Sequence, residues 1–492
     1  MTDPLLDRVD RLCGTATVLV GDHALSTTVA ALRTRLCEPL RVAVAGRVKA
    51  GKSTLLNALV GERLAPTDAG ECTRIVTWYT RADGYEASAV LRDGSERPLR
   101  FHRTDASLEI ALDDLEPSDV ERIVVGWPSS RLDDLTLIDT PGLEGHDDLS
   151  SMRTLRFLGL EDERTSDVDA VVYLMRHMHR SDVGFLEAFM DRSLSQPSPV
   201  NAVAVLSRAD EIGAGRLDAL VSARAIARRY REDERVRALC STVIPVAGLI
   251  AETGATLRED EAGSLRLLAA MPADELESLL LSVDRFSAPV SSPLPSQTRQ
   301  DLLGRFGLFG VRFALDRLSR GDAETASALS RALVAESGVE RLADLLHDHF
   351  AARARALKAR SVLVALKDVA RSLGRVEPVA SRDLLVAVEE FEATAHELAE
   401  LRLWHLTISG TVDLEAEDVA EIRRMTAADD PTERLGLAPD TPISIVRATT
   451  QDRIEYWRAR ATHPLTSRGL AEVCDILARS YEGLYAETAA GP

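Results

Sequence analysis

Short apolar runs alternate with amphipathic segments through the middle of the chain. Seven runs of strand length, most of them rich in β-branched residues, lie at 40–46, 74–80, 122–127, 134–140, 168–175, 200–207 and 241–247. Segments with helical spacing lie between them, at 53–60, 150–159, 182–191 and 216–231. This alternation predicts an α/β domain with a mostly parallel sheet and helices on both faces. The runs 168–175 and 200–206 are almost wholly apolar, as expected of central strands.

Both ends of the chain have a helical pattern. Near the start, Leu5, Val9 and Leu12 repeat at helical spacing, and from Val339 onward the pattern is almost wholly helical. Between 251 and 350 we expect helices broken by a Pro/Ser-rich loop at 287–297 and by the Gly-Leu-Phe-Gly sequence at 307–310. We therefore predict three units, namely an N-terminal helix, an α/β domain and a C-terminal helical bundle, over residues 1–38, 39–350 and 351–492.

Charge and composition exclude several classes of function. The 492 residues include 59 Lys plus Arg against 78 Asp plus Glu, which gives a formal net charge of −19. A chain this acidic lacks the electrostatic footprint of a nucleic-acid-binding protein, so neither RNA nor DNA is an expected partner. The same charge repels an anionic membrane, although a local basic face would still bind one.

The sequence also predicts a cytoplasmic protein with reduced thiols. No run approaches the ~18 consecutive apolar residues of a membrane-spanning helix, and the opening sequence MTDPLLDRVDR is not typical of a secretory signal. The five cysteines are scattered and show no metal-ligand spacing, which argues against a zinc site.

The most specific motif is a phosphate-binding loop. The sequence GRVKAGKST matches G-x-x-x-x-G-K-[ST] and stands between a predicted strand and a predicted helix, as such a loop requires. The glycines let successive backbone N–H groups face a phosphate, the Lys reaches the β and γ phosphates, and the Ser hydroxyl ligates Mg²⁺. The residues of the loop are Gly46, Arg47, Val48, Lys49, Ala50, Gly51, Lys52, Ser53 and Thr54.

A second motif supplies further contacts to the metal and the γ-phosphate. The sequence Asp-Thr-Pro-Gly at 139–142 ends a predicted strand and matches D-x-x-G. In that pattern Asp139 holds Mg²⁺ through water, and the backbone N–H of Gly142 senses the γ-phosphate.

Two more segments bear on the choice between ATP and GTP. The sequence SRAD at 207–210 follows a predicted strand and resembles the N/T-K-x-D guanine motif, with Arg208 in place of Lys and Ser207 in place of Asn or Thr. Asp210 would accept hydrogen bonds from guanine N1 and N2, a pattern that adenine does not offer. Arg208 has an aliphatic stem and a planar guanidinium that can lie along the base. Ala247 follows the last predicted strand, where a backbone N–H would contact guanine O6.

A threonine on the loop before the second strand would complete the metal site. Thr73 immediately precedes the run at 74–80 and follows Gly70, which would let the loop swing. We therefore favour Thr73 as the magnesium ligand, with Thr67 as the competing candidate.

Together the sequences GRVKAGKST, ECTRIVTWY, LIDTPG and LSRADEIGAG resemble those of the dynamin-like large GTPases, and in particular the actinobacterial branch of isoniazid-induced proteins. The stretches LGRFGLFGVR (303–312) and ESGVERLADLLHDHF (336–350) extend the resemblance. The resemblance implies a GTPase domain on a helical neck built from both chain ends. It also implies dimerisation driven by GTP, hydrolysis without an exchange factor, and work on a membrane or the cell envelope.

The chain departs from that family in the phosphate-binding loop. The family usually has a small polar residue at the position of Lys49 and a monovalent cation nearby. We hypothesise that the Lys49 ammonium replaces this cation, because only four of the 59 basic residues are lysines and two of them, Lys49 and Lys52, lie in this loop. The alternative is a solvated loop lysine. Leu143 follows Gly142, where small Ras-like GTPases have a water-orienting glutamine, so we expect slow basal turnover.

The segment 351–373 combines Arg353, Arg355, Lys358 and Arg360 with a Leu/Val face. It would be either a lipid-binding amphipathic helix or a neck helix packed on residues 4–40, and we favour the neck helix. Direct membrane insertion is then not expected of this chain, and a companion dynamin-like protein would provide it.

The sequence thus predicts an Mg²⁺-dependent GTPase that couples nucleotide-dependent homodimerisation to movement of its neck. The alternative is a nucleotide-gated scaffold with little turnover of its own, whose partner performs the membrane work. A ribosome- or RNA-associated GTPase is disfavoured by the charge.

Overall fold

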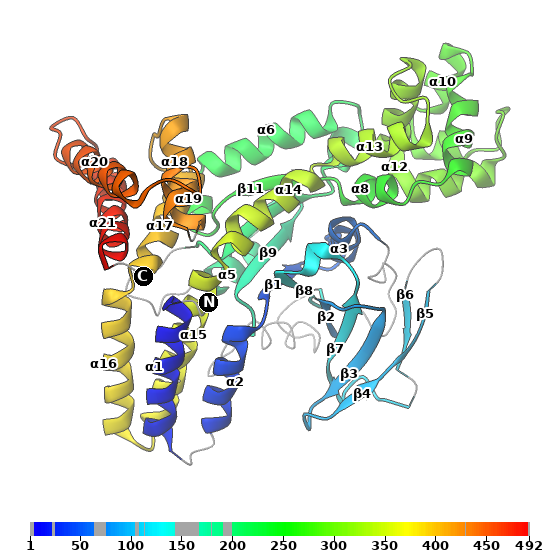
Figure 1. Ribbon diagram of the computed structural model, residues 1–492. Coiled ribbons are helices and arrows are strands. Elements are labelled where there is room, and N and C mark those ends of the chain that lie inside the picture. Colours follow the sequence, from blue (N-terminus) through cyan, green and yellow to red (C-terminus); the bar gives the residue numbers. More distant parts are fainter. Residues whose placement is uncertain are drawn as a thin grey trace.

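A computed structural model gives the structure of this chain (Figure 1). It describes residues 4–21, 25–62, 75–103, 108–112, 114–142, 167–178, 180–189, 199–428 and 430–490. Four features of the sequence analysis fall outside these ranges, namely Thr67, Thr73, Leu143 and the helix expected at 150–159.

A nine-stranded mixed sheet forms the centre, with strand order β11-β10-β9-β1-β8-β2-β7-β3-β4. The seven apolar runs are all confirmed as strands: β1 (Leu40–Gly46), β2 (Val76–Arg81), β7 (Val120–Trp127), β8 (Leu135–Asp139), β9 (Ala170–Met175), β10 (Ala202–Ser207) and β11 (Val243–Val246). The pairs from β11 through β8 are parallel, β2 runs antiparallel to β8, and β7 is parallel to β2. The prediction of a mostly parallel sheet is therefore confirmed.

Four short strands have no counterpart in the predicted set. β3 (Glu86–Leu91) and β4 (Glu96–Pro98) extend one edge of the sheet, and β5 (Arg100–Arg103) pairs with β6 (Leu108–Ala111) as a separate hairpin. In β3 buried residues alternate with exposed or half-buried ones, and all three residues of β4 are exposed. Hydrophobic runs therefore do not mark these edge strands.

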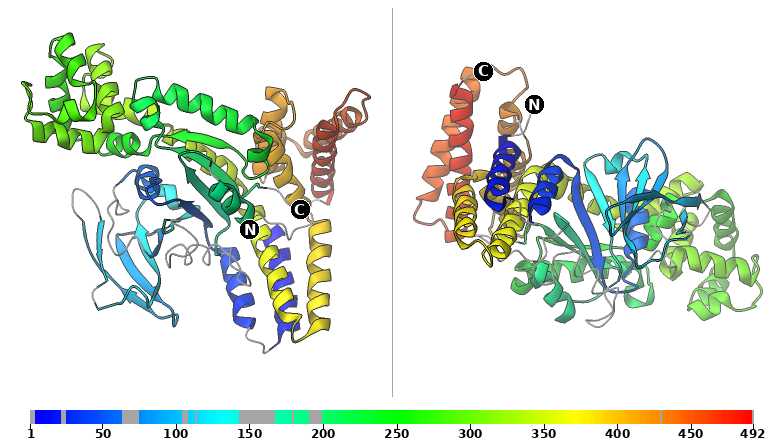
Figure 2. Two further views of the ribbon diagram at one scale, coloured as in Figure 1. Left: turned by 180° about the vertical axis from the view of Figure 1, so that it is seen from behind. Right: turned by 90° about the horizontal axis from the view of Figure 1, so that it is seen from below.

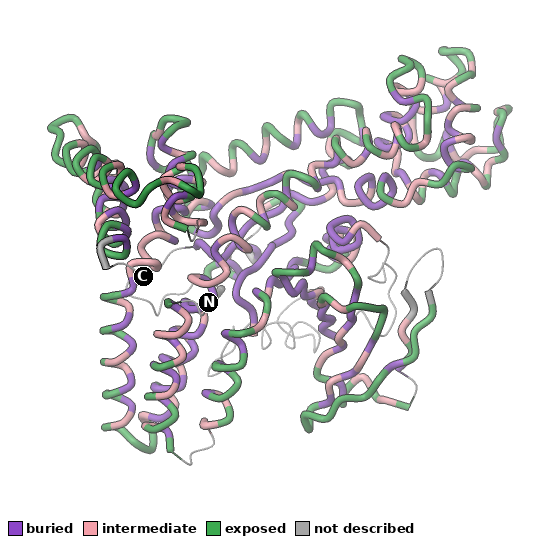
Figure 3. Tube along the Cα trace, viewed as in Figure 1, coloured by how far each residue is buried: buried purple, intermediate pink, exposed green. Residues whose placement is uncertain are grey.

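The side chains of the central strands alternate between two hydrophobic cores. In β1, Ala43 and Ala45 belong to one core, and Val42 and Val44 to the other. Helices α5 (Arg180–Phe189) and α6 (Ala219–Glu232) pack into the first core, and α3 (Lys52–Val60) and α14 (Val339–Leu345) pack into the second. Every residue of β9 and β10 is buried (Figure 3). The sheet is thus covered on both faces, as predicted.

A helical module lies at the end of the sheet remote from the neck (Figure 1). Its helices are α9 (Glu259–Ala269), α10 (Ala273–Leu279), α11 (Val283–Ser287), α12 (Ser296–Ser319) and α13 (Ala326–Ser337), and α8 (Gly248–Ala255) joins it to the sheet. The loop expected at 287–297 separates α11 from α12. The expected break at 307–310 is instead a kink at Gly307 inside α12.

The N-terminal segment forms two helices where one was expected. α1 (Pro4–Val20) ends where Gly21 adopts a left-handed φ of 57°, a conformation that stops a helix, and α2 (Ser26–Cys37) follows. Both pack with α15 (Ala354–Leu373) and α16 (Pro378–Thr394) around one apolar core. Figure 2 shows these four helices side by side, in blue and yellow. We call this four-helix group the neck.

The basic residues of α15 stabilise the neck from inside. Lys358 is 9% exposed, and its Nζ donates to the carbonyl oxygens of Leu36 (2.8 Å) and Glu38 (3.0 Å) at the end of α2. Lys367 is 5% exposed and forms an ion pair with Glu392 at 2.7 Å. Because these charges are buried against other helices, the segment is a neck helix and this charged face is not available to lipid.

The remaining helices form a second group around Trp457 and Tyr481. They are α17 (His396–Ile408), α18 (Ala416–Ala427), α19 (Pro431–Leu435), α20 (Ile443–Ala461) and α21 (Arg468–Ala490). Among the described residues, no helix has the length and apolar character that crossing a membrane requires. The division of the chain at 38/39 and 350/351 stays a prediction.

We predict that the neck depends on one buried ion pair with the sheet domain. Arg35 of α2 lies 2.6 Å from Asp169, which also accepts a hydrogen bond from the Arg41 backbone N–H at 2.9 Å, and both charged side chains are buried. Asp169→Asn should lower the free energy of unfolding by about 3–5 kcal/mol, because it leaves a buried guanidinium without its counter-charge. Urea unfolding measures this.

The matched control is Asp10→Asn, which breaks the exposed ion pair between Asp10 and Arg33. It should change the unfolding midpoint little, because solvent screens that pair. Equal effects of the two substitutions would show that burial of the Arg35 pair does not matter.

Candidate functional site

The phosphate-binding loop connects β1 to α3 with a backbone that only certain residues allow. Gly46 has φ 150°, Lys49 φ 62° and Gly51 φ 93°. A Cβ on Gly46 would lie 2.5 Å from the carbonyl oxygen of Leu174 on the neighbouring strand. Left-handed residues alternating with right-handed ones turn backbone N–H groups toward a common centre, and α3 adds its positive N-terminal end. This geometry fits a bound phosphate chain.

Lys52 lies at the start of α3, beneath this loop. Its side chain is buried, and Nζ donates to the carbonyl oxygens of Gly46 (3.2 Å) and Arg47 (3.3 Å). Burial lowers the pKa of Lys52, while the nearby carboxylate of Asp139 opposes that shift. The ammonium is therefore held at the loop, where phosphate oxygens would replace its carbonyl partners.

Ser53 and Asp139, two of the predicted metal ligands, lie side by side. The Ser53 hydroxyl donates to Asp139 Oδ2 at 3.0 Å, and Asp139 Oδ1 is buried without a hydrogen-bond partner among the described residues. Burial raises the pKa of Asp139 to about 6, against Lys52 and the Ser53 hydroxyl, which lower it. An unpartnered carboxylate oxygen next to a hydroxyl fits Mg²⁺, which prefers oxygen ligands. Ser53 and Asp139 are thus brought together as expected.

Gly142 packs directly on the phosphate-binding loop. A Cβ at this position would lie 2.3 Å from Val48 Cγ2 and 2.8 Å from Val48 Cα. Thr140 anchors the same segment, since its hydroxyl donates to the Val44 carbonyl at 2.9 Å. Only glycine fits so close to the loop, so the D-x-x-G segment and the phosphate-binding loop form one surface.

A cavity of about 130 Å³ extends from this loop to the SRAD segment. Its lining includes Ala50, Gly51, Thr54 and Leu55 on one side and Ser207, Arg208 and Asp210 on the other, together with Leu174, Val205, Glu211, Val246, Gly248 and Leu249. The strands β1 and β10 end at the same edge of the sheet, which is why these segments meet there. The cavity has the apolar walls and the single deep carboxylate that a purine would need.

Asp210 supplies that carboxylate. It is 6% exposed and is the second residue of the short turn η3 (Ala209–Ala214) after β10. Burial raises the pKa of Asp210 to about 6, an effect that the charge of Arg208 only partly offsets. A buried carboxylate that lines a cavity is suited to accept two hydrogen bonds from a ligand.

The two substituted residues of the guanine motif differ in position. Arg208 lines the cavity with φ 51°, and its guanidinium is held by Glu211 at 2.7 Å. The Ser207 hydroxyl instead donates to the Met175 carbonyl at 3.2 Å and ties β10 to β9. Both residues therefore line the cavity, and Ser207 in addition fixes the end of β10.

The contact expected from Ala247 is not available in this structure. Its backbone N–H donates to the Ser337 carbonyl at 2.9 Å, because the turn between α13 and α14 packs against the end of β11. Gly248 and Leu249 line the cavity instead. Their N–H groups belong to the first turn of α8, which has no intrahelical acceptors for them. The contact was expected at Ala247, so sequence reasoning missed Leu249, two positions further along the chain.

Two predicted residues are not tested by this geometry. Thr73 lies outside the described residues. Lys49 is exposed at the top of the loop, and its left-handed backbone is a conformation that non-glycine residues adopt mostly at functional sites.

We predict that Asp210 lowers the stability of the nucleotide-free protein above about pH 6. The folded protein binds a proton at this site up to a pH of about 6, whereas the unfolded chain releases it near 3.8, so stability is lost as the pH rises through that window. Asp210→Asn should raise the free energy of unfolding by about 1–3 kcal/mol at pH 7.5 and have no such effect below about pH 4.

Urea unfolding at several pH values measures this difference. The control is Asp218→Asn, because the Asp218 side chain is 61% exposed. A gain in stability that does not vary with pH would contradict the prediction.

Known proteins resemble this chain at three levels. Residues 42–195 match the dynamin family. The isoniazid-induced protein IniC of Mycobacterium tuberculosis is 38% identical over 461 residues, which span 93% of this chain and 92% of the relative. The isoniazid-induced protein IniA of the same species is 34% identical over 125 residues, or 23% of this chain and 19% of IniA.

Among solved structures, an oligomerised bacterial dynamin pair, described as sensing and tethering membranes, aligns with 98% of this chain and 90% of that chain, at 13% identity and a TM-score of 0.34. The identity to IniC extends over nearly the whole of both chains, far beyond the residues 42–195 that match the dynamin family. The chain therefore belongs to the dynamin family of GTPases, in the branch of the isoniazid-induced protein IniC.

Proposed function

We propose that this protein binds and hydrolyses GTP with Mg²⁺. The observation that supports this most directly is the continuity of the site, since Gly51 of the phosphate-binding loop and Asp210 line the same cavity. Lys52 would neutralise the β and γ phosphates, and the carboxylate of Asp210 would select guanine. ATP fits the same loop but offers Asp210 no matching pair of donors.

The side chains of Ser53 and Asp139 would hold the Mg²⁺, with Thr73 as a third candidate ligand. When bound there, the metal would supply positive charge to the phosphates. Gly142 would present its backbone N–H to the γ-phosphate. Because Leu143 cannot orient water, the attacking water has to be placed by the phosphate-binding loop, by a backbone carbonyl or by a residue that dimerisation brings in.

The nucleotide cycle would drive homodimerisation through the GTPase domains and movement of the neck. Membership of the dynamin family supports this, as well as a role at a membrane or the cell envelope. Because α15 is buried in the neck, membrane contact would be peripheral and would use other surfaces or a companion dynamin-like protein.

A nucleotide-gated scaffold with little turnover is the second candidate. Leu143 and the two substitutions in SRAD favour it, since they weaken water positioning and base recognition. Single-turnover hydrolysis, with and without candidate partners, separates the two functions. Tight GTP binding without any hydrolysis would support the scaffold.

The guanine assignment predicts the order of nucleotide affinities. In calorimetric titrations the protein should bind magnesium-loaded GTP at least about tenfold more tightly than ATP, because Asp210 makes charge-assisted hydrogen bonds to guanine alone. Asp210→Asn should remove this preference and favour XTP, whose 2-carbonyl accepts from the new amide. Lys52→Ala should weaken all three. Equal affinity of the wild-type protein for GTP and ATP would refute the assignment.

The role proposed for Lys49 predicts turnover that is independent of monovalent cations. Rates in Na⁺, K⁺ and choline buffers should be equal, because the ammonium is part of the loop. Lys49→Ser should reduce turnover in choline by about tenfold or more and create a response to Na⁺ or K⁺. Strong dependence of the wild-type rate on Na⁺ or K⁺ would count against this role.

A further inference from the structure

Helix α12 contains a break that ordinary residues cannot make. Gly307 has φ 64° and ψ 173°, a combination that is essentially confined to glycine, yet helical structure continues on both sides of it. Phe306 and Phe309 flank the kink and are 0% and 2% exposed. The hydrophobic core therefore holds the kink in place.

The kink lies against the carboxylate that would recognise the base. A Cβ on Gly307 would be 3.7 Å from Asp210 Oδ2 and 3.4 Å from Leu249 Cδ2. The kink of α12 thus lies close to both Asp210, after β10, and Leu249, in the first turn of α8. Both residues line the cavity.

Arg312 holds the loop that follows Asp210. Its Nη1 donates to the carbonyl oxygens of Gly215 (2.7 Å) and Ala214 (3.1 Å), and its Nη2 donates to Leu280 at 2.6 Å. The loop needs such support, because three successive residues, Gly213, Ala214 and Gly215, have φ between 60° and 68°. One guanidinium therefore fastens this left-handed loop to the helical module.

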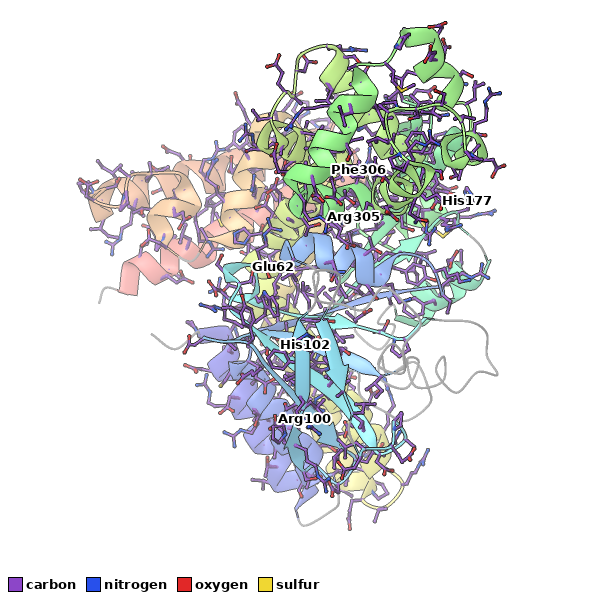
Figure 4. All side chains as sticks on the ribbon, turned by 90° about the vertical axis from the view of Figure 1, so that its right-hand side faces the viewer. Glu62, Arg100, His102, His177, Arg305 and Phe306 are labelled. Carbon is purple, nitrogen blue, oxygen red and sulfur yellow. The ribbon has the colours of Figure 1, made fainter. Side chains whose placement is uncertain are left out.

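Arg305, on the other side of the kink, fastens the wall formed by α8. The Thr253 hydroxyl of α8 donates to the Arg305 carbonyl. The Arg305 guanidinium donates to Glu261 Oε1 at 2.7 Å and to the Thr256 carbonyl at 3.1 Å. Figure 4 shows Arg305 and Phe306 together above α3, where the module meets the nucleotide-binding domain. The segment 305–312 thus braces both walls of the cavity.

We propose that the kinked segment 305–312 of α12 positions Asp210 for guanine recognition, with Arg312 as the principal positioning residue. The proposal rests on the proposed GTP-binding function. A carboxylate that accepts from both N1–H and the 2-amino group of guanine has to be aligned within a fraction of an ångström, since hydrogen bonds weaken steeply when misaligned. If the 213–215 loop were released, Asp210 would lose the restraint that aligns its carboxylate with the base.

The test uses inosine triphosphate, which lacks the 2-amino group of guanine but keeps N1–H and the triphosphate. We would measure the dissociation constants of magnesium-loaded GTP, ITP and ATP for the full chain by calorimetric titration. Arg312→Ala should weaken GTP binding by about tenfold, weaken ITP binding less because ITP offers Asp210 only N1–H, and change ATP binding less than twofold, so the GTP/ITP affinity ratio falls. Arg312→Lys, which keeps a donor and the charge, should restore part of the ratio.

The matched control is Arg320→Ala at the C-terminal end of the same helix, where the side chain is 63% exposed and Nη2 pairs with Asp316 at 2.8 Å. It should leave all three affinities unchanged. Gly307→Ala gives an independent measurement, because its strain acts at the kink and should lower the same ratio. Each ratio is taken within one variant, so a partly unfolded preparation does not imitate the effect.

Two results would overturn the proposal in different ways. An equal loss of GTP, ITP and ATP affinity in Arg312→Ala would show that α12 only supports the fold of the domain. A GTP/ITP ratio that is unchanged in Arg312→Ala and Gly307→Ala would show that Asp210 needs no brace. In both cases a wild-type preference for GTP over ATP keeps the proposed function, whereas absence of that preference would remove the function and the brace together.

Discussion

The burial of the central sheet on both faces is the constraint on which the rest of the structure depends. The strands β9 and β10 are buried along their whole length, and α3, α14, α5 and α6 supply the two cores that cover them. Polar side chains that bind a ligand have little room on those faces. They lie instead where parallel strands end, so the phosphate-binding loop, Asp139 and Asp210 all follow strands that meet at one edge.

Buried polar contacts connect the same sheet to the helical parts of the chain. At the end of β11, the Ala247 N–H bonds to Ser337, and a Cβ on Gly338 would lie 2.6 Å from the Pro245 carbonyl oxygen. The turn between α13 and α14 is therefore fitted to the loop beside the cavity. In a second contact, Trp404 of α17 donates a hydrogen bond to Nδ1 of His349, in the segment that follows α14, at 2.7 Å. Burial lowers the pKa of His405 to about 4 and that of His349 well below its usual value, so both imidazoles are neutral at pH 7, while the buried guanidinium of Arg353 lies over the Trp404 ring.

The two carboxylates of the site are buried, which disfavours their charged form. The chain carries a net charge of −19, and burial raises the pKa of both Asp139 and Asp210 to about 6. Lys52 partly offsets this near Asp139. A metal next to Asp139 and hydrogen-bond donors next to Asp210 would compensate the two carboxylates, so stability that the fold gives up at these positions is regained on binding.

Much of the fold and part of the site follow from local sequence. Periodicity identified all seven main strands and the helices at 53–60, 182–191 and 216–231, because burial on two faces leaves a continuous apolar run. The phosphate-binding loop was recognisable because its glycines and Lys52 have to be contiguous. The pairing of Ser53 with Asp139 followed from the ends of neighbouring strands.

Contacts between distant segments decided the rest. The strands β3 to β6 carry no long apolar run. The division of the N-terminal segment into two helices depends on the conformation of Gly21. The Ala247 N–H donates to the carbonyl of Ser337, which is 90 positions away in the chain. Arg312 donates to the carbonyl of Gly215, which is 97 positions away. Such contacts form only after the helical module has docked on the sheet, so no local pattern encodes them. The sequence by itself determined the residues proposed to bind phosphate and metal, whereas only the tertiary structure decided what surrounds the proposed base site, because that wall is built from parts of the chain that meet only in the folded protein.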